Sequence, residues 1–438
     1  MPYTENGTPV TVTDNLTVSD VDDTNIDSAT VAITGNFATG EDELLFASQA
    51  GITGSYDTAT GILTLTGSAT LAEYETAIRT VSYQNTSDDP SALTRTISFT
   101  INDGDIDSNL QSRDIEFTAV NDAPVLAAIE TAPVLYTENG APIAVTDNLS
   151  ASDVDDTNIE SASVAITGNF AAGEDDLLFV DQAGITGNYD ATTGILTLTG
   201  SASLADYQAA IQSVSYENTS DDPSALTRTV DFVINDGDAD SNLLSRDIEF
   251  TAVNDAPVLA SIETTPTSFT ENGSPINVTS SLSISDLDDT EIDSATINIS
   301  GNFVSGEDVL SLTEQFGITG IFDPTTGVLT LSGQALLSEY ETVLRSVTYQ
   351  NTSDNPSELT RTIDFVVNDG DIDSNPISRN VEINAENDPP VLDNIETAAV
   401  QYTENDSPVS ITASLSIDDL DNTEIDNATV TILSLIHI

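Results

Sequence analysis

The sequence predicts an all-β protein, built from tandem antiparallel β-sandwich modules that carry one short helix each and are arranged end to end. Three observations support this fold class. One segment recurs along the chain at a constant spacing of 133 residues. Within each copy, apolar residues mostly alternate with polar ones, which is the period of a half-buried strand. A single stretch in each copy has the three-and-four spacing of a helix.

The repeat is marked by the sequence Tyr-Thr-Glu-Asn-Gly. It begins at Tyr3 and Tyr136, returns at Phe269 with Phe in place of Tyr, and begins a fourth time at Tyr402. Asn-Asp-Ala-Pro or Asn-Asp-Pro-Pro lies between copies, and Pro there favours a short, extended linker. We therefore predict modules at 1–123, 124–256 and 257–389, followed by a partial module at 390–438.

Both ends of the chain cut through this pattern. The first copy lacks the leader Ala132–Leu135 that precedes Tyr136, and the last copy departs from the repeat at about residue 433. We expect a fragment of a longer repeat protein with an aberrant tail. Its start has neither the basic nor the apolar region of a signal peptide. No apolar run reaches the roughly 18 residues of a transmembrane helix, so we predict no direct membrane insertion of this fragment.

The elements of the first module follow from local patterns. Leu71, Tyr74, Ile78 and Val81 have helical spacing, which predicts a helix from Leu71 to Thr80. Thr70 and Glu73 have the spacing of a capping box at its start. Strands are predicted at Val31–Ile33, near Tyr56, at Ile62–Thr66, at Leu93–Ile101 and at Ile115–Ala119, with a hairpin turn at Asp57–Gly61. Many short strands with frequent turns favour a sandwich over a barrel.

The charge balance excludes several classes of function. The chain has 74 Asp and Glu against 8 Arg, no Lys, Cys or Trp, and a single His in its tail, for a net charge of -66. A P-loop or a Schiff-base enzyme needs Lys, and a Cys-based zinc site needs thiolates. Nucleic acid and anionic membranes are bound through Lys and Arg, so neither is an expected partner. The expected partners are cations.

The acidic residues gather in four places that recur in each copy. The first is an Asp-x-Asp-Asp segment, represented by Asp20 and Asp22, Asp153 and Asp155, Asp286 and Asp288, and Asp419 and Asp421. The second is a Gly-containing loop with Asp103, Asp105 and Asp107, Asp236, Asp238 and Asp240, and Asp369, Asp371 and Asp373. The third is the linker pair Asn121 and Asp122, Asn254 and Asp255, and Asn387 and Asp388. The fourth is a single glutamate, Glu5, Glu138, Glu271 or Glu404.

These clusters predict calcium sites. Two carboxylates about 4 Å apart repel by roughly 4 kcal/mol at an effective dielectric constant near 20, so a group of them is costly without a cation. Ca²⁺ takes six to eight oxygen ligands from carboxylates, carbonyls and amides, whereas Mg²⁺ keeps more of its water. The Asp103-x-Asp105-x-Asp107 spacing matches the first half of an EF-hand loop. It departs at the sixth position, Ser108, and at the twelfth, Asp114.

Three other interpretations stay open. The acidic loops could be solvated surface in a salt-adapted protein, although the constant spacing of the aspartates argues against drift. Paired carboxylates could serve a glycosidase, but three nearly equal copies suit a single active site poorly. Carbohydrate-binding modules would use aromatic platforms, and Tyr56, Tyr74 and Tyr83 have the spacing of core residues instead. We expect Arg95, Arg228 and Arg361 to form ion pairs with Asp88 or Asp89 or their copies.

The motifs together resemble the cadherin-like repeats of very large bacterial surface and secreted adhesins, in the style of VCBS and RTX repeat proteins. Asn-Asp-Ala-Pro at Asn121 resembles the cadherin linker, and Ser19-Asp20-Val21-Asp22 resembles its Asp-x-Asp element. Asn102-Asp103-Gly104 and Tyr-Thr-Glu-Asn resemble its late and early elements. The Asp-Arg-Glu motif of cadherins has only a partial counterpart at Leu71–Glu75, and the module is longer than a cadherin domain.

The resemblance implies a cadherin-like or Ig-like sandwich with Ca²⁺ between successive modules. The first junction would use Glu5, Asn121, Asp122, Asp153, Asp155 and Asp236. The second would use Glu138, Asn254, Asp255, Asp286, Asp288 and Asp369, and the third Glu271, Asn387, Asp388, Asp419 and Asp421. The implied function is a non-enzymatic, calcium-stiffened stalk or adhesion segment at a bacterial surface or outside the cell. Other cell-surface proteins or glycans stay open as further partners.

Overall fold

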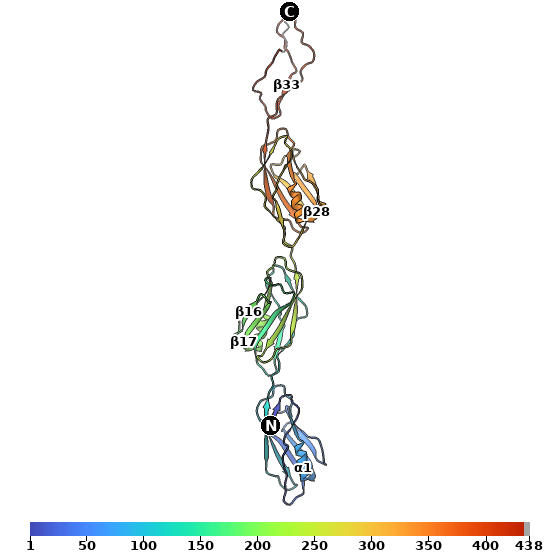
Figure 1. Cartoon of the computed structure of the whole chain (residues 1–438), viewed down its shortest axis with the longest axis vertical. Helices are drawn as coiled ribbons and strands as arrows, with labels where there is room; N and C mark the ends of the chain where they lie inside the picture. The colour runs from blue at the N-terminus through green and yellow to red at the C-terminus, as the bar shows by residue number, and fades with distance from the viewer. Residues whose placement is uncertain (433–438) are drawn as a thin grey trace. The chain divides into compact units, whose positions relative to one another are not determined.

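A computed structural model describes residues 1–432 of the chain, which can be followed in Figure 1. The chain forms two compact units, Met1–Thr251 and Ala252–Ile438. We call the successive copies of the sequence repeats 1, 2 and 3 and the partial repeat. Repeats 1 and 2 lie in the first unit, and repeat 3 and the partial repeat lie in the second.

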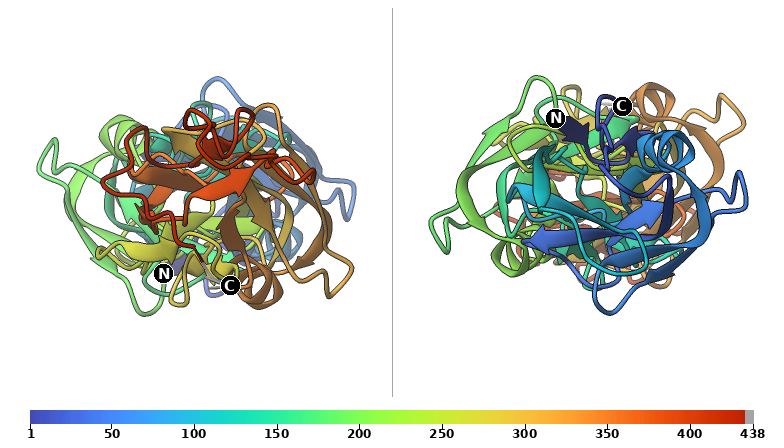
Figure 2. Two further views of the ribbon diagram at one scale, coloured as in Figure 1. Left: turned by 90° about the horizontal axis from the view of Figure 1, so that it is seen from above. Right: turned by 90° about the horizontal axis from the view of Figure 1, so that it is seen from below.

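Repeat 1 is a β-sandwich of a six-stranded and a three-stranded sheet. The large sheet contains, in spatial order, β1 (Pro2–Thr4), β9 (Gln111–Thr118), β8 (Arg95–Asn102), β3 (Asn25–Gly35), β6 (Ile62–Thr70) and β5 (Thr53–Asp57). The small sheet contains β2 (Val10–Thr11), β7 (Ser82–Asn85) and β4 (Asp42–Leu45). All pairs are antiparallel except β1 and β9, which run parallel. The right-hand view of Figure 2, seen from below, shows this repeat, in blue, end-on.

Repeats 2 and 3 reproduce this topology. In repeat 2 the large sheet contains β11 (Val134–Thr137), β20 (Leu244–Thr251), β19 (Arg228–Asn235), β14 (Asn158–Gly168), β17 (Ile195–Ser203) and β16 (Thr186–Asp190). The small sheet contains β12 (Ile143–Ala144), β18 (Ser215–Asn218) and β15 (Asp175–Leu178). In repeat 3 the large sheet contains β22 (Thr267–Thr270), β31 (Ile377–Asn384), β30 (Arg361–Asn368), β25 (Glu291–Gly301), β28 (Val328–Leu336) and β27 (Thr319–Asp323). The small sheet contains β23 (Ile276–Asn277), β29 (Thr348–Asn351) and β26 (Asp308–Ser311).

A small additional sheet begins each repeat after the first. It pairs a linker strand with a strand about 25 residues further on. These pairs are β10 (Val125–Ala127) with β13 (Ser150–Ser152), β21 (Val258–Ala260) with β24 (Ser283–Ser285), and β32 (Val391–Asp393) with β33 (Ser416–Asp418). The linkers are therefore extended, as the prolines predict, and the strand after each one pairs with the repeat that follows.

One short helix per repeat is confirmed. Helix α1 spans Leu71–Arg79, and the predicted capping box between Thr70 and Glu73 is present. Helices α2 (Leu204–Gln212) and α3 (Leu337–Arg345) are its counterparts. In α1 the buried residues are Tyr74, Ala77 and Ile78, so the apolar spacing marks the face of the helix that packs on the core. None of the helices in residues 1–432 has the length and apolar character needed to cross a bilayer.

Each repeat has its own hydrophobic core. The three clusters of buried residues run from Tyr3 to Phe117, from Leu126 to Ile248 and from Leu259 to Ile383. The alternating residues of β3, β6 and β8 supply much of the core of repeat 1. Tyr74 and Tyr83 are fully buried, and the Tyr56 hydroxyl donates to the Asp42 carbonyl at 2.7 Å. These tyrosines serve packing and hydrogen bonding rather than an exposed sugar platform.

The predicted partner of the buried arginines is wrong. Arg95 is buried and ionically paired, but its Nε lies 3.1 Å from Asp42 Oδ2, and both side chains are 0% exposed. Asp88 and Asp89 lie exposed after β7. Asp42 begins β4, about 50 residues before Arg95, and only the packing of the two sheets brings them together. Arg228 with Asp175 and Arg361 with Asp308 repeat the pair.

Candidate metal centre at the linkers

The linker residues contact the acidic loops of the repeat that follows. In the first unit, Asn121 Nδ2 donates to Asp236 Oδ2 at 3.0 Å, and the Asp122 amide lies 3.2 Å from Asp155 Oδ2. Two loops that are about 80 residues apart in sequence are therefore joined through the linker. The resemblance to cadherin-like repeats implies one site for these four residues, and the structure brings Asn121 to Asp236 and Asp122 to Asp155.

The second unit shows the same arrangement once in full and once in part. Asn254 Nδ2 donates to Asp369 Oδ2 at 3.0 Å, and the Asp255 amide donates to Asp288 Oδ2 at 3.1 Å. In the partial repeat the Asp388 amide donates to Asp421 Oδ2 at 2.9 Å. Asn387 Oδ1 there accepts from Asn422 Nδ2 at 2.9 Å.

The first aspartate of each loop is held by its own backbone. Asp153 Oδ1 accepts from the amides of Asp155 and Asp156 at 3.2 and 3.0 Å, and Asp286 does the same with Asp288 and Asp289. These local hydrogen bonds fix the loop and use only one carboxylate oxygen. The other oxygen stays available for a further ligand.

Several carboxylate oxygens near the linkers are buried without a hydrogen-bond donor. Buried polar atoms are normally satisfied, so a group of exceptions calls for a physical reason. In the first unit these are Glu5 Oε1, Asp122 Oδ2 and Asp153 Oδ2. In the second unit they are Asp255 Oδ2, Glu271 Oε1, Asp286 Oδ2, Asp288 Oδ1, Asp293 Oδ1 and Asp421 Oδ1.

No arginine side chain forms an ion pair with these groups within residues 1–432. Each of the eight arginines pairs with a different carboxylate, for example Arg246 with Glu130 and Arg379 with Glu263. The charges at the linkers are therefore negative and without a basic partner in this part of the chain. A cation bound by oxygen ligands would satisfy them, and the donor set is that of Ca²⁺.

The glutamate near the start of repeats 1 to 3, Glu5 and its copies Glu138 and Glu271, is the most deeply buried acidic residue at the linkers. Glu5 is 5% exposed and Glu271 is 3% exposed. Glu5 Oε2 accepts from the Val120 amide at 2.7 Å, and Glu271 Oε2 accepts from the Glu386 amide at 2.8 Å. Burial, together with the charges of Asp122 and Asp155, raises the pKa of Glu5. Glu138 is buried to the same extent, and Glu404 in the partial repeat lies exposed.

The third aspartate of the Asp-x-Asp-Asp segment is a site residue that the predicted ligand set left out. Burial and the charges of Asp155, Asp153, Asp236 and Asp238 raise the pKa of Asp156. Asp289 in repeat 3 shows the same effect. Carboxylate oxygens of Asp286, Asp288 and Asp289 lie within 4.8 Å of one another, as do those of Asp20, Asp22 and Asp23. Their position directly after Asp155 and Asp288 in the sequence could have identified Asp156 and Asp289 as members of the site.

Part of the Gly-containing loop has a different use. Asp107 Oδ1 accepts from Asn102 Nδ2 at 2.8 Å, which closes the loop on itself, and Asp240 and Asp373 do the same. Asp105, Asp238 and Asp371 lie exposed and contribute charge. Asp103 Oδ1 accepts from two backbone amides at 2.8 and 2.9 Å, and Asp236 and Asp369 accept in the same way within their own loops. In repeat 1 the three aspartates with the EF-hand-like spacing lie in the loop that joins β8 to β9.

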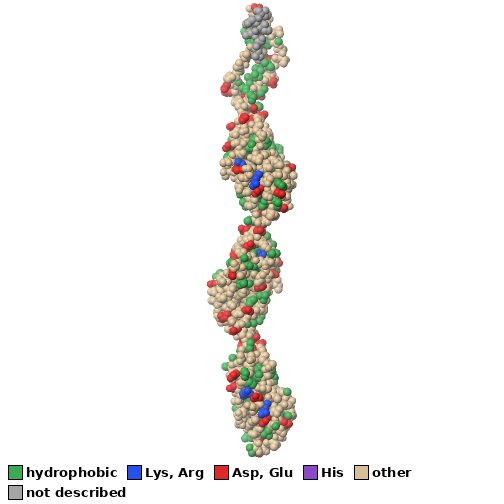
Figure 3. All heavy atoms as spheres, in the orientation of Figure 1, with side chains coloured by type: hydrophobic (Ala, Val, Ile, Leu, Met, Phe, Trp, Pro, Cys, Tyr) green, Lys and Arg blue, Asp and Glu red, His purple; other side chains and the backbone are tan. Residues whose placement is uncertain are grey.

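Burial of the Asp-x-Asp-Asp segment differs between the repeats. In repeats 2 and 3, Asp153, Asp155, Asp286 and Asp288 are half-buried. In repeat 1 the corresponding Asp20 and Asp22 are exposed. Figure 3 shows acidic side chains, in red, gathered around the linker within each unit. For Asp236, burial alone would raise the pKa, but hydrogen bonds from Asn121 and from the Ala239 and Asp238 amides lower it.

The fold and these sites define the chain as a tandem β-sandwich repeat protein with acidic linker sites. No protein-family model matches it. It is 28% identical over 411 residues to Halomucin of Haloquadratum walsbyi, covering 83% of this chain and 4% of that protein. It is 26% identical over 338 residues to Integrin beta-like protein A of Dictyostelium discoideum, covering 75% of this chain and 15% of that protein. The chain therefore spans a small part of both relatives.

Solved structures of cadherin ectodomains are also similar to the chain at low identity. Extracellular cadherin domains 1–5 of Protocadherin Gamma B2 are 16% identical, with 96% of this chain and 65% of that chain covered and a TM-score of 0.32. Domains EC22–24 of mouse Cadherin-23 are 14% identical, with 88% and 95% covered and a TM-score of 0.28.

Proposed function

We propose that the chain is a non-enzymatic, Ca²⁺-binding segment of a large extracellular repeat protein involved in adhesion. Its modules would span 1–123, 124–256 and 257–389, with a partial module from 390. The observation that carries the proposal is the set of buried carboxylate oxygens without donors at each linker. The similarity to small parts of Halomucin and Integrin beta-like protein A supports a repeat region within a much longer protein.

Each residue of the site has a separate part in holding the linker. Asn121 and the Asp122 amide bind the linker to the loops of repeat 2. Glu5 holds the chain just before the linker, through Val120 of repeat 1. Ca²⁺, when bound, supplies the positive charge that lets these carboxylates lie together. Because the ligands come from the linker and from both sides of it, binding favours the ordered arrangement over a loose one by mass action.

The experiment is a calorimetric Ca²⁺ titration of the chelated chain, with small-angle scattering before and after. We expect saturable binding at about 10⁻⁴–10⁻³ M, the range of extracellular calcium modules, together with a longer and stiffer particle. Mg²⁺ at equal concentration should bind more weakly, because the site offers many protein oxygens and Mg²⁺ keeps its water. An unchanged scattering profile, or no saturable heat, would contradict the proposal.

A matched pair of variants tests the ligand set. Glu5→Gln keeps an oxygen for the Val120 amide but removes the buried charge, so we expect about tenfold weaker Ca²⁺ binding at one site. Glu116→Gln, on the exposed face of β9 in the same repeat, removes the same charge away from the linker and should leave the titration unchanged. Equal effects of the two changes would show that only total charge matters.

A further inference from the structure

The outer face of the small sheet differs between the repeats at one pair of facing positions. In repeat 1, Glu43 lies opposite Gln84, and Gln84 Nε2 donates to Glu43 Oε2 at 2.8 Å. In repeat 2 both positions are acidic, because Asp176 of β15 lies directly opposite Glu217 of β18. Facing residues on neighbouring strands have their Cβ atoms about 4.5–5.5 Å apart, and two like charges there destabilise a sheet.

No positive group of the chain compensates this pair of charges. Asp176 and Glu217 are both half-buried. Each of the eight arginines forms its ion pair with another carboxylate, and within residues 1–432 these two side chains accept no hydrogen bond. Repeats 1 and 3 avoid the repulsion, because Gln84 and Gln350 occupy the position of Glu217. Repeat 2 therefore has a pair of carboxylates that a cationic group from outside the chain would neutralise.

An exposed aliphatic surface continues from the acidic pair along the same segment. Leu178 lies two residues after Asp176, on the same face of β15, and is 38% exposed. Val180 follows beyond the end of the strand and is 81% exposed. A surface pocket of about 510 Å³ is lined by Leu178, Phe179, Val180, Gln182, Ser213 and Ser215. Carboxylates and an aliphatic pocket therefore adjoin on one face of repeat 2.

The other repeats do not have this combination. In repeat 3 the counterparts of Leu178 and Val180 are Ser311 and Thr313, and Ser311 Oγ lies 2.8 Å from Thr348 Oγ1 on the facing strand. In repeat 1 an alanine takes the place of Val180. Repeats 1 and 3 thus each have a hydrogen bond across these two strands, whereas repeat 2 has unpaired carboxylates beside exposed aliphatic side chains.

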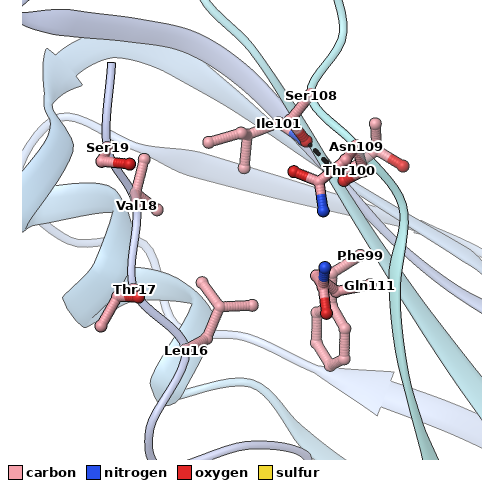
Figure 4. A pocket seen from close by; sticks show the side chains of 10 residues that line it. All are labelled: Leu16, Thr17, Val18, Ser19, Phe99, Thr100, Ile101, Ser108, Asn109 and Gln111. Carbon is pink, nitrogen blue, oxygen red and sulfur yellow. Dashed lines mark hydrogen bonds between the residues drawn. The ribbon is translucent and has the colours of Figure 1, made fainter. Parts of the chain in front are cut away.

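A pocket in repeat 1 differs in its chemistry. It has a volume of about 110 Å³ and lies between Leu16–Ser19 and the hairpin of β8 and β9. Figure 4 shows Leu16 and Val18 on one side of it and Asn109 and Gln111 on the other. All of its lining residues are uncharged, so no charge there selects an occupant. In repeat 2 the carboxylates beside the pocket specify what kind of group would bind.

We propose that this face of repeat 2 binds an extended basic segment of another protein. The segment places a Lys or Arg against Asp176 and Glu217, and aliphatic side chains two and four residues further on against Leu178 and Val180. This spacing follows from an extended chain, in which alternate side chains share a face at intervals of about 6.6–6.8 Å. The partner is not a second copy, because the chain has no Lys and all eight arginines already form ion pairs within it.

Long-range and short-range forces have different parts in this binding. The net charge of -66 attracts any basic protein, and that attraction does not distinguish one surface from another. Specificity comes from charge-assisted hydrogen bonds to two carboxylates, next to a surface that buries an aliphatic stem. None of these residues belongs to the ligand set of the linkers. The proposal therefore goes beyond the proposed function by stating the chemistry of a partner, and it does not rest on Ca²⁺.

The experiment measures the binding of two labelled peptides to the 438-residue chain by fluorescence anisotropy in EDTA. NaCl at about 0.15 M shortens the Debye length to about 8 Å and so suppresses non-specific attraction. The peptide Thr-Arg-Thr-Leu-Thr-Val-Thr has Arg, Leu and Val on one face of an extended chain. The peptide Thr-Thr-Arg-Leu-Val-Thr-Thr has the same composition and charge but divides them between two faces. We expect saturable binding of the first peptide, at least about fivefold tighter than that of the second.

Variants that copy the other repeats test the surface without unfolding it. Glu217→Gln gives repeat 2 the acid–amide pair of repeat 1, and we expect binding of the first peptide to weaken about tenfold. The same change should raise the melting temperature, because it removes a like-charge pair. Val180→Thr, which copies repeat 3, should weaken binding about fivefold. Glu43→Gln is the matched control: it removes the same charge from the facing pair of repeat 1 and should leave binding unchanged.

Several results would overturn the proposal. Equal binding of the two peptides, or equal weakening by Glu217→Gln and Glu43→Gln, would mean that net charge alone attracts the peptide. Absence of saturable binding contradicts it directly. Competition by added Ca²⁺ that Glu217→Gln abolishes would mean that the acidic pair holds an ion instead of a basic side chain. Because the binding is measured in EDTA, its failure is distinct from failure of the calcium titration at the linkers.

Discussion

The buried Asp42 organises an entire end of the core of repeat 1. Its carboxylate accepts from Arg95, from the Tyr83 hydroxyl and from Asn85 Nδ2 at 2.7 Å, while the Ala38 amide binds its second oxygen at 2.8 Å. Burial and the hydrogen bond to Asp42 raise the pKa of Tyr83 well above its ordinary value, so the phenol remains a donor. The Asp42 carboxylate is thus the common acceptor of all four groups.

We expect Asp42→Asn to be severely destabilising. It leaves the Arg95 guanidinium, which is 0% exposed, without a counter-charge, and breaking a buried pair from one side costs about 3–5 kcal/mol. Calorimetry of the full chain should show one transition moving to lower temperature while the others stay in place.

The control for this change lies in the same repeat. Asp14 is 3.8 Å from Arg113 and 81% exposed, so Asp14→Asn should change stability by less than about 0.5 kcal/mol. A comparable loss from both substitutions would mean that net charge, rather than the buried pair, sets the stability of this repeat.

At the scale of elements, the three helices differ in how they begin. Thr70 and Ser203 accept from the amide three residues on, which satisfies one of the free donors of the first turn. Helix α3 begins after Leu336, whose side chain has no acceptor, and only Glu339 reaches back, accepting from the Leu336 amide at 3.1 Å. Repeat 3 therefore has half of a capping box.

Leu336→Thr is expected to stabilise repeat 3. Leu336 is 46% exposed, so little packing is lost, and Thr restores the missing acceptor at a position whose backbone is already extended. The gain should be about 0.5–1 kcal/mol. Hydrogen exchange of the first-turn amides of α3 should slow in the variant, while the amides of α1 serve as an internal reference. Unchanged exchange in α3 would show that the cap is not limiting there.

The elements also show what the sequence can predict. Alternation and helical spacing are local, and β6, β8, β9 and α1 lie where these patterns place them, with ends differing by a few residues. Strand β3 contains the predicted Val31 and Ile33 but begins earlier, at Asn25. Contacts between residues that are distant in the sequence and meet only through packing were harder to predict. Arg95 lies on a buried register, but Asp42 had nothing in its own neighbourhood to identify it. The parallel pairing of β1 with β9 likewise depends on the whole sandwich.

At the scale of the whole molecule, the repeat gives information that a single copy would not. Constant spacing indicated that the acidic positions recur, and the resemblance to cadherin-like repeats implied a junction that includes Asn121, Asp122, Asp155 and Asp236, whose contacts the structure shows. The spacing does not show which carboxylate oxygens would bind a cation, since Asp103 and Asp107 recur equally well. Nor does it show that Leu126 of the linker strand is a buried residue, because in its own sequence Leu126 is one apolar residue among several.

We expect the stability of the chain to depend on pH in opposite ways with and without Ca²⁺, because the carboxylates at the linkers can bind either protons or the ion. Burial raises the pKa of Glu5, Asp156 and Asp289, so without a cation the folded chain binds protons more readily than the unfolded chain. These groups therefore favour the folded state increasingly as the pH falls through their raised pKa values toward the pKa values of the unfolded chain.

Other carboxylates act in the opposite direction at lower pH. For Glu263, hydrogen bonds from Thr279 and Ser280 outweigh burial, which alone would raise its pKa, and lower it to about 2. Glu396, bonded to Thr412, has its pKa lowered to about 2 as well. Their contribution to stability is present above the unfolded pKa of about 4.5 and is lost as the pH falls from there toward 2.

The calcium-free chain should therefore have its highest melting temperature in mildly acidic solution, above about pH 4.5 and below neutral. With Ca²⁺ the order reverses, because protons compete for the same oxygens and the stabilisation by Ca²⁺ shrinks as the pH falls. Calorimetry at matched ionic strength, in EDTA and in Ca²⁺, measures both curves. Parallel curves in the two conditions would mean that the buried carboxylates at the linkers do not hold the ion, since a bound cation and a bound proton cannot occupy the same oxygen.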